Sequence, residues 1–228
     1  MGGSSLPAAV RPSLGIIRHN APAMSLTAES LLSDLDATLP QATDSWRNAA
    51  LRQIVQLFLS GAEAYSEEQV ALFDEVMGRL IKKKMDRAHL AELSDVLAGV
   101  GNAPAKVLAT LARHADPAIY GPVLERATAL SDTDLVEIAD KDRIDQSVLA
   151  KIAARGELSE PVTEVLLKRG NGALRRKIME NQKARVSEMG FARVVSAING
   201  DKALAAAIAA RPEMPDELRP FVDAALSQ

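Results

Sequence analysis

Apolar residues recur at steps of three and four along nearly the whole chain, and no stretch alternates for long enough to predict a β-strand. The first clear example follows Asp44, where Trp46, Leu51, Ile54, Val55, Phe58 and Leu59 give a helix a broad apolar face. The pattern therefore predicts an all-α protein.

Helix start and stop signals divide the first hundred residues. Ser66 with Gln69 three residues later is a capping box, and Asp86 precedes another apolar helical pattern. Gly99 and Gly101 close that pattern. These signals predict an N-terminal helical bundle over residues 24–101.

The chain then repeats itself. Segments beginning at Arg113, Ser131 and Leu149 resemble segments beginning at Arg169, Ser187 and Leu204, at offsets of 56, 56 and 55 residues. Similarity at one offset is the signature of stacked supersecondary units. We therefore predict copy one over residues 104–158, copy two over 160–213 and a terminal cap over 214–228, which together make up a repeat region of 102–228.

Each copy is expected to hold four short helices. The predicted ranges are 104–113, 118–128, 132–139 and 146–154 in copy one, and 160–169, 173–181, 188–198 and 202–210 in copy two. Pro104, Pro161 and Pro215 each fall in an opening first turn, where a missing N–H costs little, and Pro220 is expected to break or kink the last segment. Two helices per half-copy predict a HEAT-like α-solenoid.

The amino-acid composition excludes several kinds of site and indicates where the protein is located. The 228 residues are 47% hydrophobic but only 3% aromatic, contain no cysteine and carry a formal net charge of -3. Disulfides, thiol nucleophiles and thiolate metal sites are excluded, and a cytoplasmic location is expected. The longest apolar run, 203–210, is too short for a membrane span. Residues 1–23 mix Gly, Ser and Pro without a period and predict a disordered leader, so that Met24 is a candidate natural start.

A family resemblance covers Arg47 to Gln228. The residues that carry it are Tyr65 to Asp74, Arg79-Leu80-Ile81, Pro122-Val123-Leu124, Leu130-Ser131 and Pro161-Val162-Thr163. In these segments the chain resembles the alphaproteobacterial domain of unknown function 2336. The resemblance implies a bacterial helical-repeat protein and brings no catalytic residues with it.

No residue pattern predicts catalysis, a metal or a cofactor. His19, His89 and His114 lack a second histidine at ligand spacing, and Gly99-Val-Gly101 follows a helix and runs into Pro104. Acidic pairs such as Asp132 with Asp134 and Asp140 with Asp142 are better explained as a capping box and a solvated turn. We therefore expect no catalytic, cofactor-binding or metal-binding residues.

One charged segment is a candidate partner-binding site. From 168 to 193 there are two acids and eight cations, namely Lys168, Arg169, Arg175, Arg176, Lys177, Lys183, Arg185 and Arg193. The broadly equivalent stretch of copy one, 116–145, has eight acids against three cations. Gly170-Asn171-Gly172 is expected to offer free N–H groups at a helix start, which would suit a phosphate or an acidic peptide. The alternative is that Gly170 ends a helix, Asn171-Gly172 makes a turn and the charges only solvate the surface.

The sequence thus predicts a non-catalytic protein–protein interaction, scaffold or regulatory module that binds a protein or an acidic peptide on a helical-repeat surface. The alternative is nucleic-acid binding, or a base-excision type of protein, through the basic cluster at 168–193. A negative net charge and few aromatic residues argue against that alternative. A purely structural homodimer is a third possibility, and the oligomeric state stays open.

Overall fold

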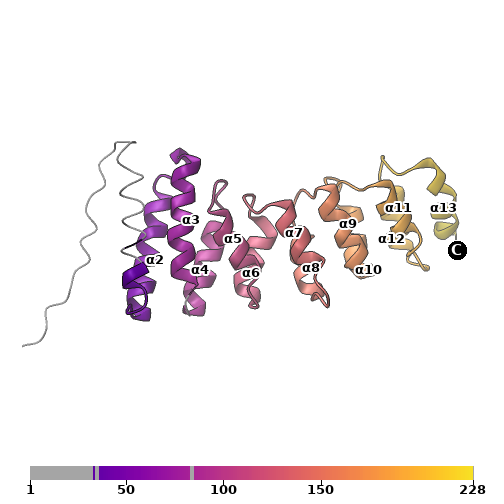
Figure 1. Cartoon of the computed structure of the whole chain (residues 1–228). Coiled ribbons are helices and arrows are strands. Elements are labelled where there is room, and N and C mark those ends of the chain that lie inside the picture. The colour runs from indigo at the N-terminus through magenta and orange to yellow at the C-terminus, as the bar shows by residue number, and fades with distance from the viewer. Residues whose placement is uncertain (1–32, 34–35, 83–84, 228) are drawn as a thin grey trace, which may run out of the picture.

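The helices of the protein stand side by side in an elongated row of antiparallel pairs (Figure 1). The computed structural model describes residues 33, 36–82 and 85–227, so the predicted leader, residues 1–23, lies outside the described residues. Within them there is no β-strand, only one isolated parallel bridge between Leu158 and Ala184. The all-α prediction is confirmed.

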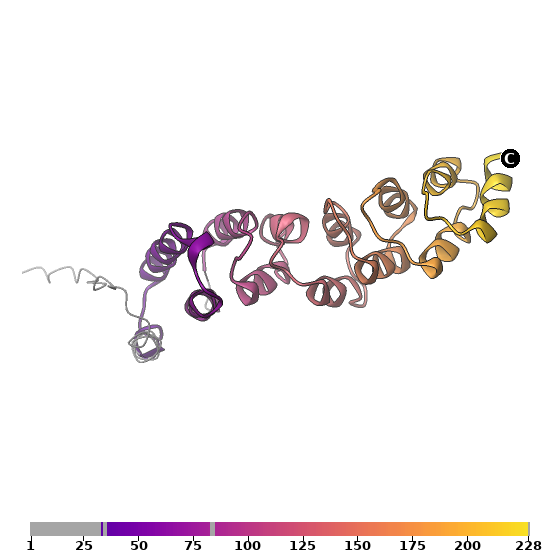
Figure 2. The ribbon, with the colours of Figure 1, turned by 90° about the horizontal axis from the view of Figure 1, so that it is seen from above.

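Seen along the helix axes, the helices form two rows (Figure 2). Row one holds α2 (Asp44–Leu59), α4 (Arg87–Leu97), α6 (Pro117–Arg126), α8 (Gln146–Ile152), α10 (Gly172–Glu180), α12 (Lys202–Ala209) and α13 (Arg219–Ser227). Row two holds α3 (Glu67–Ile81), α5 (Ala105–Ala112), α7 (Asp132–Ala139), α9 (Glu160–Arg169) and α11 (Glu188–Val195). Short 3-10 turns lie at η2 (Ala62–Ala64) and η3 (Asp216–Leu218). The core lies between the rows, because each helix turns its apolar face toward the other row.

From α3 onward, the side chains that cap the helices differ between the two rows. In row one, α4, α6, α8, α10 and α12 begin after a side chain that accepts a first-turn N–H, namely Asp86, Asp116, Asp145, Asn171 and Asp201. In row two, Ser66, Ser131 and Ser187 do the same for α3, α7 and α11. The predicted capping box of Ser66 with Gln69 is formed in both directions.

The predicted helices of the two copies correspond closely to the observed ones. The largest difference is α11, which ends at Val195 rather than at 198, because Ser196 caps it and the chain turns through Asn199 and Gly200 at positive φ. Near the C-terminus the break comes between η3 and α13, just before the expected position, and Pro220 lies in the first turn of α13.

Two arginines, 56 residues apart, donate hydrogen bonds to backbone carbonyls at equivalent places in the two copies. Arg155 donates to the carbonyls of Leu124 and Ala127, 2.9 and 2.7 Å away, where α6 ends. Arg211 donates to the carbonyls of Asn181 and Ala184 and to the Glu213 carboxylate, just after α10 ends. Both satisfy carbonyls that a helix end leaves without a partner, so the duplication extends to tertiary contacts.

Packing continues across the predicted boundary at 101/102. The buried Asp74 carboxylate of α3 accepts the N–H groups of Lys106 and Val107, 3.0 and 2.8 Å away, and so caps α5, whose own N-cap is Pro104. Asn102 donates to the carbonyl of Ala62. Helices α3 and α4 therefore pack on α5 and α6 as neighbours in the two rows.

An ion pair joins the starts of α4 and α6 and gives a pH prediction. Arg87 binds the Asp116 carboxylate with two nitrogens, and these hydrogen bonds, followed by one from the N–H of Ala118, lower the pKa of Asp116 to about 2. A carboxyl whose pKa is lower in the folded state stabilises that state fully above its unfolded pKa of 3.8 and loses the effect as the pH falls toward 2. We expect urea unfolding of Asp116→Asn to show a shallower loss of stability over this window than the parent chain. Parallel curves for the two proteins would contradict the assignment.

Candidate functional site

Helix α10 presents the centre of the predicted basic cluster on the outer side of row one. Its inner side is anchored by Leu174, Ile178 and Met179, which are buried against the core. Because these residues recur at steps of four and one, Arg176 and Lys177 are left on the opposite side of the helix. The local pattern of apolar residues thus fixes where the two cations point.

The start of α10 is tightly built. A Cβ atom on Gly170 would come within 2.6 Å of the Leu166 carbonyl and 2.4 Å of Leu174, so only glycine fits between α9 and α10. Asn171 then caps α10 through the N–H of Leu174, and Gly172 is already helical, so the Asn-Gly turn considered from the sequence is not formed. The expectation of free N–H groups is wrong for Gly170, whose N–H donates to the carbonyl of Leu166 at 2.8 Å, and for Asn171, whose N–H donates to Gln146 of α8 at 3.0 Å.

Four of the eight predicted cations bind acids of neighbouring helices or loops. Lys168 and Arg169 bind Asp140 at 3.2 and 2.8 Å, and these contacts, led by Arg169, lower the pKa of Asp140. Lys183 binds Glu157 at 3.2 Å, and Arg193 binds Glu164 at 2.9 Å. Some of the opposite charges of the two copies therefore pair with each other: Asp140, at the end of α7 in copy one, binds Lys168 and Arg169 of α9 in copy two.

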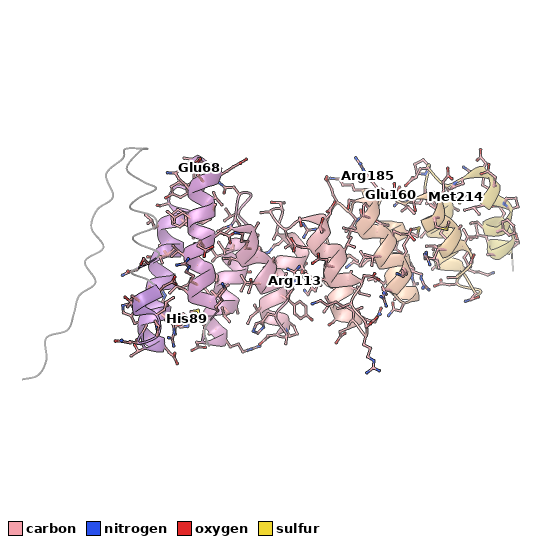
Figure 3. The ribbon with its side chains drawn as sticks, in the orientation of Figure 1. Glu68, His89, Arg113, Glu160, Arg185 and Met214 are labelled. Carbon is pink, nitrogen blue, oxygen red and sulfur yellow. The ribbon has the colours of Figure 1, made fainter. Side chains whose placement is uncertain are left out.

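The other four cations differ in position. Arg175 donates its Nε to the carbonyl of Leu167, 3.1 Å away, at the end of α9. Arg176, Lys177 and Arg185 have no ion pair within 4.0 Å among the described residues. Arg185 lies in the loop after α10, on the upper edge near Glu160 and Met214 (Figure 3). The structure therefore brings together Arg175, Arg176 and Lys177 on α10 and places the remaining members on other edges and faces.

The two copies differ at the positions around Arg176. In copy one, Gly121 of α6 makes room for the stem of Lys151 from α8, which reaches Glu125 at 2.9 Å. That hydrogen bond, with further contributions from Lys151, Lys177 and Arg126, lowers the pKa of Glu125. In copy two the corresponding residues are Arg176, Ala207 and Glu180. In copy one the cation at this place, Lys151, belongs to α8, whereas in copy two it is Arg176 of α10 and the α12 position is an alanine. Glu180 forms no ion pair with any of the described residues.

Small side chains cover the outer surface of α12, the helix that packs beside α10. Helix α12 packs along α10 and exposes Ala203, Ala206 and Ala210, with Ala207 half-buried between them. At the matching surface of copy one, Lys151 and Glu125 form an ion pair at the edge of an open hollow that Gly121 also lines, whereas copy two has two cations beside small side chains. We call Arg176, Lys177 and this alanine surface the α10–α12 face. Sequence reasoning found its cations and missed the alanines, whose only signal was the low polarity of 203–210.

The other candidates of the sequence have structural partners. His114 accepts the N–H of Asp116 through Nδ1 at 3.0 Å, and Asp134 binds Arg113 at 2.8 Å while Ser131 caps α7. His89 contacts Arg52 of α2 through Nε2 at 2.7 Å. Across the described ranges no three His, Asp or Glu side chains gather in a way that could hold a metal ion. In the same ranges no helix is long and apolar enough to cross a bilayer.

Comparison with known proteins gives one match. Residues 119–220 match the family model of DUF2336, an uncharacterised protein conserved in bacteria. This match begins in α6 and ends in α13, and so covers the C-terminal part of copy one, all of copy two and the α10–α12 face. Searches of curated proteins and of solved structures found no match. The resemblance to this family is thus supported over residues 119–220, and over the rest of 47–228 the resemblance stays a prediction.

Proposed function

We propose that the protein is a non-catalytic binding module of HEAT-like, α-solenoid type that holds an acidic segment of a protein partner on the α10–α12 face. The observation that carries this proposal is that Arg176 and Lys177 form no ion pair within 4.0 Å among the described residues, on an outward surface whose copy-one counterpart holds the ion pair of Lys151 with Glu125. Cations with few internal contacts gain charge-assisted hydrogen bonds when an acidic chain arrives.

The small number of unpaired cations on the α10–α12 face favours a peptide over a duplex. Two adjacent cations next to exposed alanines can meet a few carboxylates of one extended or helical segment. A nucleic-acid surface needs cations that follow a backbone at many phosphates, and here Lys168, Arg169, Lys183 and Arg193 already bind acids of this chain.

Charge reversal on α10 tests the proposal. We expect Arg176→Glu with Lys177→Glu to weaken binding of a fluorescein-labelled, Asp- and Glu-rich peptide by about tenfold or more, because each lost charged contact is worth on the order of 1 kcal/mol. Fluorescence anisotropy at low salt measures this. The matched control, Lys141→Glu with Arg143→Glu, changes the charge equally in the exposed turn before α8 and is expected to leave affinity nearly unchanged.

Duplex and single-stranded DNA are titrated in the same assay at several salt concentrations. DNA binding that falls steeply with salt and requires Arg176 and Lys177, with no peptide binding, would replace the proposal by the nucleic-acid alternative. Equal effects of the two double variants on peptide affinity would remove the α10–α12 face as the site.

A further inference from the structure

A groove of about 250 Å³ lies between α2 and α4 on the outer side of row one, far along the row from the α10–α12 face. Leu51, Val55, Leu59, Leu93 and Val96 make it apolar. Leu59 is 40% exposed there, and the nearby Leu57 of the same helix is 53% exposed. Helices α2 and α4 pack together less closely than α4 and α6, which leaves the groove open.

Polar atoms at the rim of the groove lack partners. Asn48 Oδ1 and His89 Nδ1 are buried and have no hydrogen bond to any residue in the described part of the chain, and both residues line the groove. Arg52 donates to His89 Nε2 at 2.7 Å, which leaves the ring hydrogen on Nδ1, and the nearest carboxylate oxygen, of Asp86, is 3.9 Å away. Buried polar atoms without partners are rare in folded proteins, so their presence here points to a ligand.

The charge at the rim limits what that ligand is. Arg52 and Glu92 are both exposed and both line the groove, and neither forms an ion pair within 4.0 Å among the described residues. The guanidinium of Arg52 contacts the imidazole of His89. An apolar groove along two parallel helices fits the side chains of a third helix at steps of three and four. A guanidinium at its edge fits a carboxylate on that helix.

The described residues just before α2, 36–42, are held outside the groove. Asp36 binds Arg79 of α3, in row two, and the carbonyls of Leu39 and Ala42 accept hydrogen bonds from Arg47. The contact of Asp36 with Arg79 places this segment beside α3, and none of its residues lines the groove. We propose that the groove between α2 and α4 docks an amphipathic helix of a protein partner, which inserts large aliphatic side chains between Val55 and Val96 and places an Asp or Glu against Arg52.

The test uses the full chain and a designed helical peptide of about 15 residues, with leucines at positions i, i+4 and i+7 and a glutamate beside them. Its anisotropy is compared with that of two matched peptides, one with the leucines replaced by alanine and one with the glutamate replaced by glutamine. Trp46, the single tryptophan, lies on α2 and reports that the fold is intact. We expect the leucine peptide to bind at least about tenfold more tightly than the alanine peptide, and the glutamine peptide to bind less tightly.

Two variants locate the site. Val96→Lys fills the groove at a half-buried position, and Arg52→Glu reverses the rim charge; each is expected to weaken binding about tenfold. Gln53→Glu, exposed on the same helix and outside the groove, is expected to have little effect. The Arg176→Glu with Lys177→Glu variant is expected to bind the peptide normally, which separates this proposal from the proposed function. No binding by the full chain, as when residues 1–32 cover the groove, or equal binding of the leucine and alanine peptides, would overturn it.

Discussion

Arg211→Ala is expected to lower the free energy of unfolding by about 3–4 kcal/mol, one of the largest effects of any single change in this chain. The Arg211 side chain is 0% exposed and donates to the Asn181 carbonyl, the Ala184 carbonyl and the Glu213 carboxylate. Truncation leaves buried carbonyls without a donor and opens a cavity where α10, α12 and the final turn meet. Urea unfolding followed by circular dichroism measures the loss, which corresponds to a drop in Tm of about 10 °C for a chain of this length.

Arg155 provides the matched control for Arg211. It makes the same kind of contact in copy one, with the carbonyls of Leu124 and Ala127, but it is only half-buried, and burial lowers its pKa. Arg155→Ala is therefore expected to cost less, about 1–2 kcal/mol, because water can reach the carbonyls that it leaves. Equal losses at the two positions would show that burial does not set the energy of this contact.

The fold could be predicted from the sequence where local chemistry and period agree. Ser131, Asp145 and Ser187 each precede an apolar helical pattern, and each is the observed N-cap. The offset of 55 to 56 residues also makes Arg155 and Arg211 equivalent positions of the two copies, and each donates hydrogen bonds to backbone carbonyls at and after the end of a row-one helix. Such signals depend on neighbours in the chain, which the sequence shows directly.

Features that depend on distant residues were not predictable. The charge of the 168–193 segment suggested one basic site, but Asp140, Glu157 and Glu164 bind four of its cations across helix boundaries. No local pattern marks Asp74 as a capping residue, because the helix that it caps, α5, begins about thirty residues later. The α2–α4 groove had a weak signal in the broad apolar face of α2, which is wider than the contact with α3 can cover.

Phe58→Ala is expected to destabilise the N-terminal helices by about 3–5 kcal/mol. Phe58 is 0% exposed, and its ring lies 5.2 Å from that of Phe73 in α3 and 6.0 Å from that of Tyr65, centroid to centroid. Removing the ring leaves a cavity and two edge-to-face or stacked contacts without their partner. Leu57→Ala, at the exposed neighbouring position, is expected to change stability by less than about 0.5 kcal/mol.

The helices that lose stability in Phe58→Ala show whether the protein unfolds as one unit or in two parts. Helix α3 caps α5 through Asp74, and α4 packs along α6, so neighbouring helices transmit stability from one to the next. Trp46 fluorescence reports on α2, and circular dichroism reports on all helices. If the array unfolds as one unit, both signals move to lower urea together. A shift confined to Trp46 fluorescence, with the amides of α7 to α12 still protected from hydrogen exchange, would instead show that residues before 102 unfold separately from the repeat region, as the predicted domain boundary requires.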